Sequence, residues 1–252
     1  MEIIKETIKW GNSAGVLLPK GWLGSQVKII LIERSLEIKK EVLRILDNYL
    51  EDILGIYLTG SYARNEQTKK SDIDIIAITN RTRKEIISGK YHISLATLDG
   101  IKETLDKNPE LILPRIIEAK VIINSNLLEE LRSWKVDKDS FKRFISDTRE
   151  TIKINKEMLK LDREMNRDAS GSVVYSIILR LRSVFLINCL LKKKDYKKRD
   201  FLKWIKEGIE EDISDAYEIY ESVRDEKKAK IKITLEKAKK LIKFLKTKIN
   251  DK

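Results

Sequence analysis

The chain has 252 residues, of which 42% are hydrophobic and 37% are charged. This length and apolar content suffice for one large domain or for two or three small ones, so the fold needs no disulfide framework. A single cysteine, Cys189, excludes an internal disulfide and indicates a reducing compartment; we expect a small buried side chain there rather than a nucleophile. No apolar stretch of the roughly 20 residues that span a bilayer and no signal-peptide core are expected, which predicts a cytoplasmic protein without a membrane partner.

The formal net charge is +12, from 52 basic and 40 acidic residues. Such a balance favours polyanionic partners such as nucleic acid, nucleotides or an acidic protein. A lysine-rich and isoleucine-rich composition is also typical of heat-adapted organisms. Charge therefore supports the motifs below but does not by itself assign a function.

Short β-rich runs follow one another within residues 1–33, and we expect strands over residues 3–10, 15–18 and 27–32. Residues 10–20 read WGNSAGVLLPK and residues 24–29 read GSQVKI, which resembles the AbrB/MazE swapped-hairpin family. The resemblance implies a half-barrel completed by a second copy, hence a homodimer, with DNA as a partner and Lys9, Lys20 and Lys28 as phosphate contacts. The alternative is that these strands extend the sheet of the next domain.

Two further segments follow. Helical spacing from residue 34 to about 55 and strands over residues 56–59, 73–79, 91–98 and 120–123, with helices between them, predict a small mixed-sheet α/β domain at 34–136. Residues 137–252 show only amphipathic helical patterns, at 141–165, 173–191, 201–209, 213–223 and 233–249, and predict an antiparallel helical bundle. The predicted fold class is therefore α+β, with an N-terminal β-rich segment.

The most informative stretch joins a Gly-Ser turn to a pair of aspartates. The turn, Gly60-Ser61, follows one predicted strand, and Asp72 and Asp74 open the next. Glycine lets the backbone approach a ligand closely, and the turn amides with the serine hydroxyl can hold a phosphate. Residues two apart on a strand point to the same side, so both carboxylates can grip one divalent cation. Each half alone is common, and an Asp-x-Asp pair is often only a strand edge facing water.

This arrangement resembles the nucleotidyltransferase signature of the DNA polymerase β superfamily, and its ten-residue gap is similar to that of the minimal nucleotidyltransferases. The resemblance implies that Gly60 and Ser61 hold the triphosphate of a nucleoside triphosphate, with Asp72 and Asp74 as catalytic ligands of Mg²⁺. Arg64 is a candidate to neutralise phosphate charge or a plain surface arginine. The implied reaction is attack of an acceptor hydroxyl on the α-phosphorus, with pyrophosphate leaving.

The family pattern breaks at the third carboxylate, which active members carry on the neighbouring strand. Residues 91–98 read YHISLATL and contain no acid. His92 or Ser94 occupies the expected place, and Asp99 follows the strand. His92 is a candidate base or a structural histidine, and Asp99 is a candidate acid or the cap of the next helix.

The helical segment resembles HEPN and kanamycin-nucleotidyltransferase C-terminal bundles over residues 174–182 and 216–224. Tyr217, Tyr220 and Arg224 share one helix face by their spacing and are candidates to line a nucleotide pocket, or form an ordinary packed aromatic stripe. HEPN ribonucleases use an arginine followed closely by a histidine. This segment has no histidine, so ribonuclease activity of that kind is not expected.

Three hypotheses remain. The first is a Mg²⁺-dependent nucleotidyltransferase that uses a nucleoside triphosphate, ATP by preference, and a hydroxyl acceptor on a protein or RNA. The second is a catalytically silent nucleotide-binding regulator or antitoxin with a dimeric DNA-binding N-terminal element. The third is a structural scaffold, against which the aspartate pair argues.

Overall fold

The computed structural model describes residues 5, 8–27, 35–69 and 71–250. Its contacts divide the chain into two units, Met1–Glu41 and Val42–Lys252, and each is described by itself. Lys28 and all of the predicted strand at 27–32 except Val27 lie outside the described residues, as does much of 3–10.

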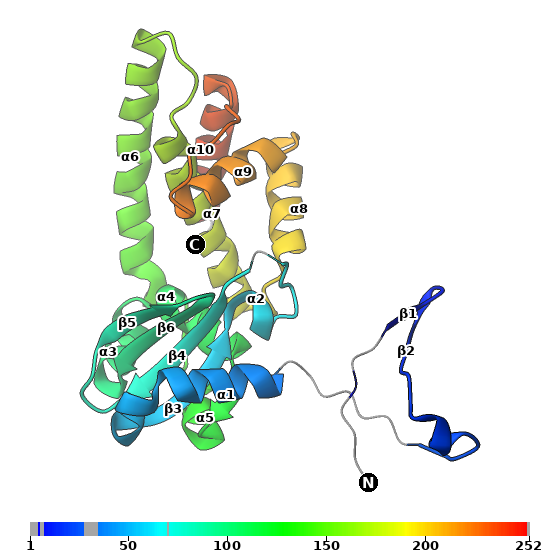
Figure 1. Cartoon of the computed structure of the whole chain (residues 1–252). Helices are drawn as coiled ribbons and strands as arrows, with labels where there is room; N and C mark the ends of the chain where they lie inside the picture. Colours follow the sequence, from blue (N-terminus) through cyan, green and yellow to red (C-terminus); the bar gives the residue numbers. More distant parts are fainter. Residues whose placement is uncertain (1–4, 6–7, 28–34, 70, 251–252) are drawn as a thin grey trace. The chain divides into compact units, whose positions relative to one another are not determined.

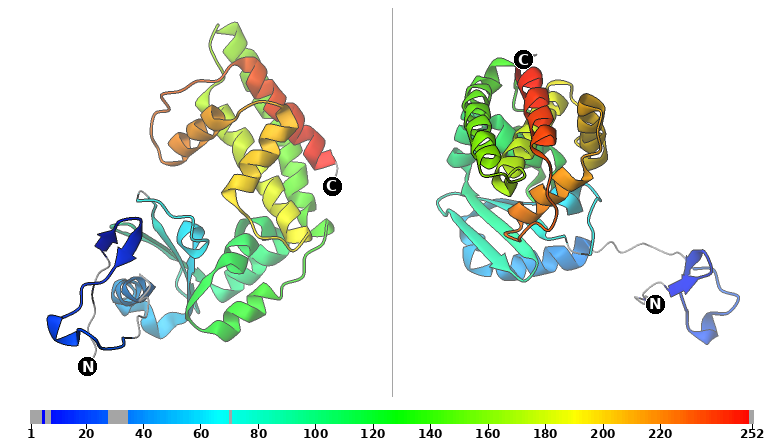
Figure 2. Two further views of the ribbon diagram at one scale, coloured as in Figure 1. Left: turned by 90° about the vertical axis from the view of Figure 1, so that its right-hand side faces the viewer. Right: turned by 90° about the horizontal axis from the view of Figure 1, so that it is seen from above.

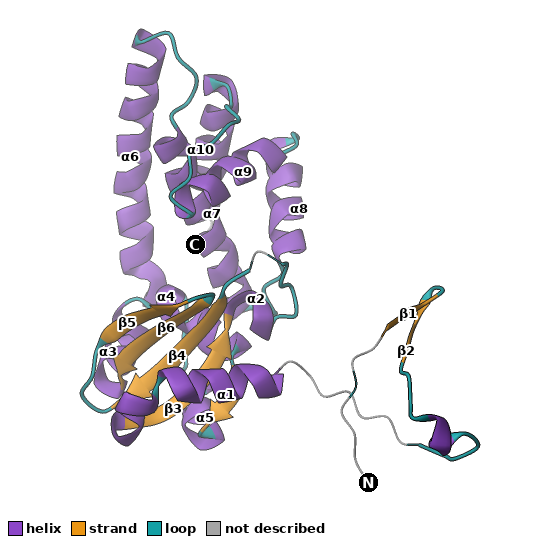
Figure 3. Ribbon diagram, in the orientation of Figure 1, coloured by secondary structure: helices purple, strands orange, loops and turns teal. Residues whose placement is uncertain are grey.

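The first unit contains a short hairpin, in which β1 (Ile8–Trp10) pairs antiparallel with β2 (Ser13–Gly15), followed by a 3₁₀ helix at Lys20–Trp22 (Figure 3). The predicted strand at 15–18 overlaps β2 only at Gly15, so this expectation is largely wrong. Val27, the one described residue of the strand predicted at 27–32, lies in no strand. Several large apolar side chains of this unit are exposed: Ile8, Trp10, Leu17, Leu18, Leu23 and Val27.

The second unit is built on a five-stranded mixed sheet (Figure 1). Its strands, in spatial order, are β5 (Lys84–Ser88), β6 (Tyr91–Thr97), β4 (Ile73–Thr79), β3 (Ile53–Thr59) and β7 (Lys120–Ile123). Only β4 and β6 are parallel, and the other neighbours are antiparallel. The predictions for 73–79 and 120–123 are confirmed to the residue, β3 begins three residues earlier than expected, and the edge strand β5 was not predicted.

Successive side chains along each strand point to opposite sides of the sheet, and both faces of the sheet are apolar. One face packs against α3 (Leu98–Lys107), α4 (Pro109–Glu118) and α5 (Ser125–Arg132), in a core with Tyr57, Ile76 and Ile78 from the strands and Leu113 and Leu128 from the helices. In Figures 1 and 2, the end of α1 lies over the opposite face, where its Val42 is fully buried.

The helix predicted from residue 34 to about 55 is shorter than expected. α1 spans Ser35–Ile45, and a 3₁₀ helix at Asp47–Asp52 leads into β3. One very short helix, α2 (Gly60–Ala63), separates β3 from the loop that precedes β4.

Five helices follow, as predicted: α6 (Lys142–Glu164), α7 (Gly171–Leu191), α8 (Lys198–Ile209), α9 (Ser214–Arg224) and α10 (Leu235–Asn250). α7 is the central helix, and it contacts α6, α9, α10 and also α4 below the bundle. Val136 and Leu190 pack against both the bundle core and the core under the sheet. The α/β part and the bundle are therefore joined by apolar packing within one unit.

α7 also corrects an expectation about membranes. By length and composition it is apolar enough to cross a bilayer, with a mean hydropathy of 1.7 over its most apolar stretch, whereas no such stretch was expected. Half of that stretch is buried in the protein, and its inward side chains include Val174, Ile178 and Leu181. Its apolar character is what the core helix of a bundle requires.

Candidate functional site

The turn that ends β3 is shaped around Gly60. Its φ of 71° lies in the left-handed region, which favours glycine. A Cβ atom built at this position would collide with the Oδ2 atom of Asp74. The Gly60 α-carbon therefore packs directly on the Asp74 carboxylate, which joins the two halves of the sequence motif. Ser61 follows in α2 and is half-buried.

Strand register brings the other candidates to the same end of the sheet. Asp74 pairs with Thr59 of β3 on one side and with His92 of β6 on the other. Asp72 is exposed and precedes Asp74 by two residues, so strand alternation turns both side chains to one face. Burial raises the pKa of the Asp74 carboxyl; the positive charge of Arg115 offsets part of this rise, and the negative charge of Asp72 adds to it.

The residues around this pair were tested for a metal site. Among the described residues, no group of three or more histidine, cysteine, aspartate or glutamate side chains is placed to hold a cation. Mg²⁺ is usually held by one or two carboxylates together with water and substrate phosphates. The carboxylates of Asp72 and Asp74, beside the glycine turn, are oxygen groups of the kind that such a cation prefers.

The three candidates for the place of the missing third carboxylate differ in their position relative to Asp74. Asp99 lies in the first turn of α3, after Thr97, which pairs with Thr79 at the far end of β4. The structure therefore does not bring Asp99 to Asp74, and Thr97, whose side chain accepts a hydrogen bond from the Gly100 amide, is the cap of α3. Ser94 donates its hydroxyl proton to Glu85 of β5. Only His92 of these candidates stands next to Asp74 in register.

Glu118, the last residue of α4, is a site residue that the sequence did not reveal. Its Oε1 atom accepts the Gly60 amide proton at 2.8 Å, and its Oε2 atom accepts from Nη1 of Arg64 at 2.7 Å. Arg64 also pairs with Glu66 at 2.9 Å, so two carboxylates neutralise the guanidinium that was expected to meet phosphate. A signal did exist in hindsight, because a carboxylate at a helix C-terminus is disfavoured by the helix dipole.

The α9 candidates lie inside the bundle rather than on an open surface. Tyr217 and Tyr220 are 8% and 3% exposed, and their ring centroids are 5.4 Å apart. Tyr220 stacks on Tyr175 with a centroid distance of 5.3 Å. Arg224 pairs with its neighbour Asp225 at 2.8 Å. The packed aromatic stripe describes Tyr220 well, whereas Tyr217 also lines a pocket.

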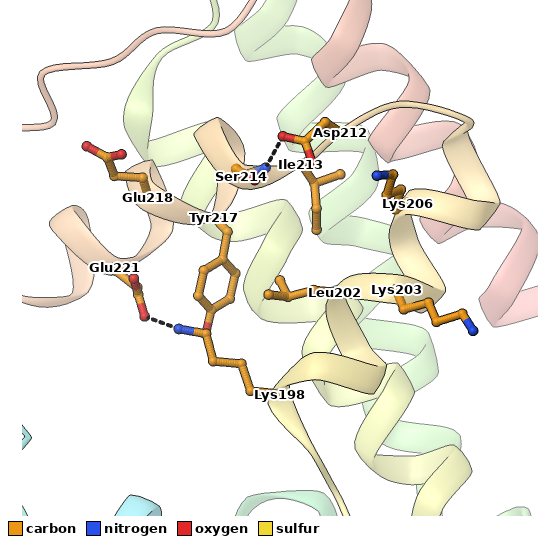
Figure 4. Close-up of a pocket in the computed structure, with 10 residues that line it drawn as sticks. All are labelled: Lys198, Leu202, Lys203, Lys206, Asp212, Ile213, Ser214, Tyr217, Glu218 and Glu221. Atoms are coloured by element: carbon orange, nitrogen blue, oxygen red, sulfur yellow. Dashed lines mark hydrogen bonds and ion pairs between the residues drawn. The ribbon is translucent and has the colours of Figure 1, made fainter. Parts of the chain in front are cut away.

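That pocket, of about 360 Å³, lies between α8 and α9 (Figure 4). The Nζ atom of Lys198 lies 4.4 Å from the centroid of the Tyr217 ring and 2.8 Å from Glu221. Burial raises the pKa of the Tyr217 hydroxyl. A second pocket, of about 520 Å³, lies between α2, α4 and the link from α7 to α8, and is lined by Arg64, Glu118 and Tyr196 among others. Cys189 also lines it, half-buried, as a thiol whose pKa is raised by burial.

Residues 37–161 match the family model described as the nucleotidyltransferase domain. No curated protein matches the chain by sequence. Two solved structures are similar over 85% of this chain. One is a nucleotidyltransferase-like protein from Exiguobacterium sibiricum 255-15, with 13% identity, 75% of that chain covered and a TM-score of 0.38. The other is the spectinomycin adenyltransferase AAD(9) from Enterococcus faecialis with ATP and spectinomycin, with 16% identity, 99% of that chain covered and a TM-score of 0.47.

The family match does not reach residues 1–36 or 162–252, so the AbrB-like and HEPN-like resemblances stay predictions. It does include the glycine turn and both aspartates. The segment that carries Gly60, Ser61, Asp72 and Asp74 therefore matches the nucleotidyltransferase domain family.

Proposed function

We propose that this protein transfers a nucleoside monophosphate from a nucleoside triphosphate, with ATP as the preferred donor, to a hydroxyl acceptor in a Mg²⁺-dependent reaction. The observation that carries the proposal is the contact between the Gly60 α-carbon and the Asp74 carboxylate, beside Asp72, within the nucleotidyltransferase match. This contact supports the proposal because a backbone that can approach phosphate lies next to carboxylates that can bind a cation.

In this proposal Gly60 and Ser61 hold the polyphosphate, and Asp72 and Asp74 hold the cation, which supplies charge neutralisation at the phosphates when bound. The acceptor oxygen forms a bond to the α-phosphorus while the bond to pyrophosphate breaks. His92, next to Asp74 in register, takes the proton of the acceptor hydroxyl. The negative charge of Asp74 stabilises the protonated imidazole that results.

A transfer assay tests this function. The full chain is incubated with ATP labelled on the α-phosphate, Mg²⁺ and cell extract, and label on protein or RNA is measured. We expect transfer by the wild type and at least a hundredfold loss in the Asp72→Asn/Asp74→Asn variant, because both cation ligands are removed. Asp106→Asn, an exposed aspartate on α3, is the matched control and should keep full activity.

The alternative is a catalytically silent nucleotide-binding regulator or antitoxin, and the same assay separates the two. Tight ATP binding without transfer, by a wild type that is folded and supplied with extract, would favour the regulator. If transfer does occur, the label on protein or on RNA identifies which acceptor class the enzyme uses.

We also propose that residues 1–33 form a dimerising, DNA-binding element. The exposed apolar side chains of the first unit support a second copy as partner: Trp10 is 65%, Leu17 60% and Leu23 78% exposed. Deleting residues 1–33 should halve the mass measured in solution by light scattering and weaken DNA binding. An unchanged mass would contradict the dimer.

A further inference from the structure

The ring of Tyr196, in the link between α7 and α8, carries two guanidinium groups from different parts of the second unit. The Cζ atom of Arg64 lies 5.5 Å from the ring centroid, and that of Arg182, on α7, lies 5.2 Å from it. The Nε atom of Arg182 also donates a long hydrogen bond of 3.4 Å to the Tyr196 hydroxyl. Two like charges on one ring repel each other unless anions accompany them.

Of these two guanidinium groups, only that of Arg64 has carboxylate partners among the described residues. Arg64 binds Glu66 and Glu118, as described above. Arg182 has no carboxylate partner among the residues that the structure describes; the groups that act on its charge are the hydroxyls of Tyr196, Tyr217 and Tyr220.

The tyrosine hydroxyls do not neutralise Arg182. Burial raises the pKa of both Tyr217 and Tyr220, so these side chains stay protonated near neutral pH. A half-buried guanidinium keeps its charge and presents up to five donors. Leaving such a group without an anion costs free energy, since part of its hydration has been lost. A bound anion would offset this loss of hydration free energy through charge-assisted hydrogen bonds.

The position of Arg182 connects it to the glycine turn. Tyr196 links it to Arg64, and Glu118 links Arg64 to the Gly60 amide. The start of α8 is also tied to the loop after α2, since the Lys198 amide donates to Oε1 of Glu66 at 3.3 Å. Arg64 and Tyr196 also line the second pocket, so a ligand in that pocket lies beside this group of aromatic and basic side chains.

We propose that Arg182, with the hydroxyls of Tyr196 and the α9 tyrosines, binds a phosphate group of a substrate. This inference rests on the proposed function and adds to it, because it places an anion-binding subsite on the bundle rather than on the α/β part. The phosphate belongs either to the nucleotide or to the acceptor. Both sources use the same chemistry, a phosphate oxyanion held by a planar donor fork.

Two calorimetric titrations of the full chain distinguish the sources. ATP with Mg²⁺ is titrated into the free protein, and inorganic phosphate is titrated into protein saturated with a non-hydrolysable ATP analogue. For Arg182→Gln we expect affinity to fall about tenfold or more in one titration, because a charge-assisted contact is lost. Loss in the first assigns the subsite to the nucleotide, and loss only in the second assigns it to the acceptor.

Arg180→Gln is the matched control, two residues earlier on α7. Its guanidinium lies over the Phe144 ring at 5.6 Å, away from the tyrosine cluster, and this variant should bind as the wild type does. Arg182→Lys keeps the charge without the planar fork and should lose less affinity than Arg182→Gln. If Arg182→Gln does not fold by circular dichroism, Arg182→Lys carries the test.

Unchanged affinity in both titrations, for a folded Arg182 variant, would overturn the subsite. The proposed transfer reaction fails by a different result, namely transfer that survives the loss of Asp72 and Asp74. The two outcomes are therefore separable.

Discussion

Two carboxylates of the second unit, one at the end of the sheet and one in the bundle, show what separates a structural acid from a candidate ligand. Asp162 of α6 has a fully buried side chain, and it accepts from Nε of Arg167 at 2.6 Å and from the Ser170 amide at 2.8 Å. Asp74 is only partly buried, and among the described residues no hydrogen bond to its carboxylate oxygens is found; its Oδ2 atom lies against the backbone at Gly60.

The difference between Asp162 and Asp74 shows which carboxylate has hydrogen-bond acceptors without donors. Buried carboxylates in folded proteins are nearly always satisfied by donors, and Asp162 follows this rule at the corner between α6 and α7. Asp74 loses hydration without gaining donors, which raises its pKa. That arrangement is unfavourable for the free protein and becomes favourable when a cation binds.

Asp162→Ala should show the largest effect on stability. It leaves the Ser170 amide without its acceptor and breaks the pair with Arg167, at a cost of about 3 kcal/mol in the free energy of unfolding. Urea denaturation measures this cost, and ATP binding by the remaining folded protein should be unchanged. Asp168→Ala, at an exposed aspartate nearby, is the control and should lose less than about 0.5 kcal/mol. Equal stability of the two variants would remove the structural role assigned to Asp162.

Gly60→Ala comes next, with an expected loss of about 2 kcal/mol from positive φ and overpacking together. Gly89 is the matched control because its φ is also positive, at 57°, but nothing lies within 4 Å of an added Cβ. Gly89→Ala should therefore cost about 1 kcal/mol from backbone strain alone. Only Gly60→Ala should also weaken ATP binding, as measured by calorimetry. Equal effects of both variants would mean that the contact with Asp74 has no role.

The motif residues were predictable because their relation is local. Strand alternation predicted that Asp72 and Asp74 lie on one side, although β4 begins only at Ile73, and β3 with its glycine turn was the natural partner of β4. The family pattern offered His92 or Ser94 beside the pair, and the parallel register of β4 and β6 puts His92 next to Asp74.

Other parts of the site depend on contacts far apart in sequence. Glu118 reaches Gly60 across 58 residues, and Arg182 meets Arg64 only through the ring of Tyr196. No local pattern encodes such contacts. The two alternatives for Asp99 stayed open for the same reason, since its distance from Asp74 depends on which end of β6 faces the glycine turn. The short edge strand β5 carries too few apolar residues to be recognised by alternation.

Glu118→Gln sharpens the comparison between satisfied and open groups at the glycine turn. The Glu118 carboxylate holds the Gly60 amide and Arg64, both of which we expect phosphate to use. Removing its charge should tighten ATP binding about threefold to tenfold, by weakening the competing anion. Glu66→Gln takes a carboxylate from Arg64 without touching Gly60, and should change affinity less. Weaker binding by Glu118→Gln would show instead that Glu118 supports the turn in its binding shape.

The smallest expected effect is on stability at Asp74 itself, and pH controls it. Because burial raises the pKa of Asp74 in the folded protein above its ordinary value of 3.8, the folded state binds this proton more tightly than the unfolded state does. Stability therefore falls as pH rises from 3.8 through the folded pKa, and the full penalty is present at neutral pH. Asp74→Asn removes the ionised group and should raise the melting temperature slightly at pH 7, with less difference from the wild type near pH 4. Mg²⁺ favours the ionised carboxylate, so millimolar Mg²⁺ should reduce the advantage of Asp74→Asn at pH 7. Thermal melts of both proteins across this pH range, with and without Mg²⁺, measure the difference. A wild type that is more stable than Asp74→Asn at every pH would count against an open ligand position at Asp74.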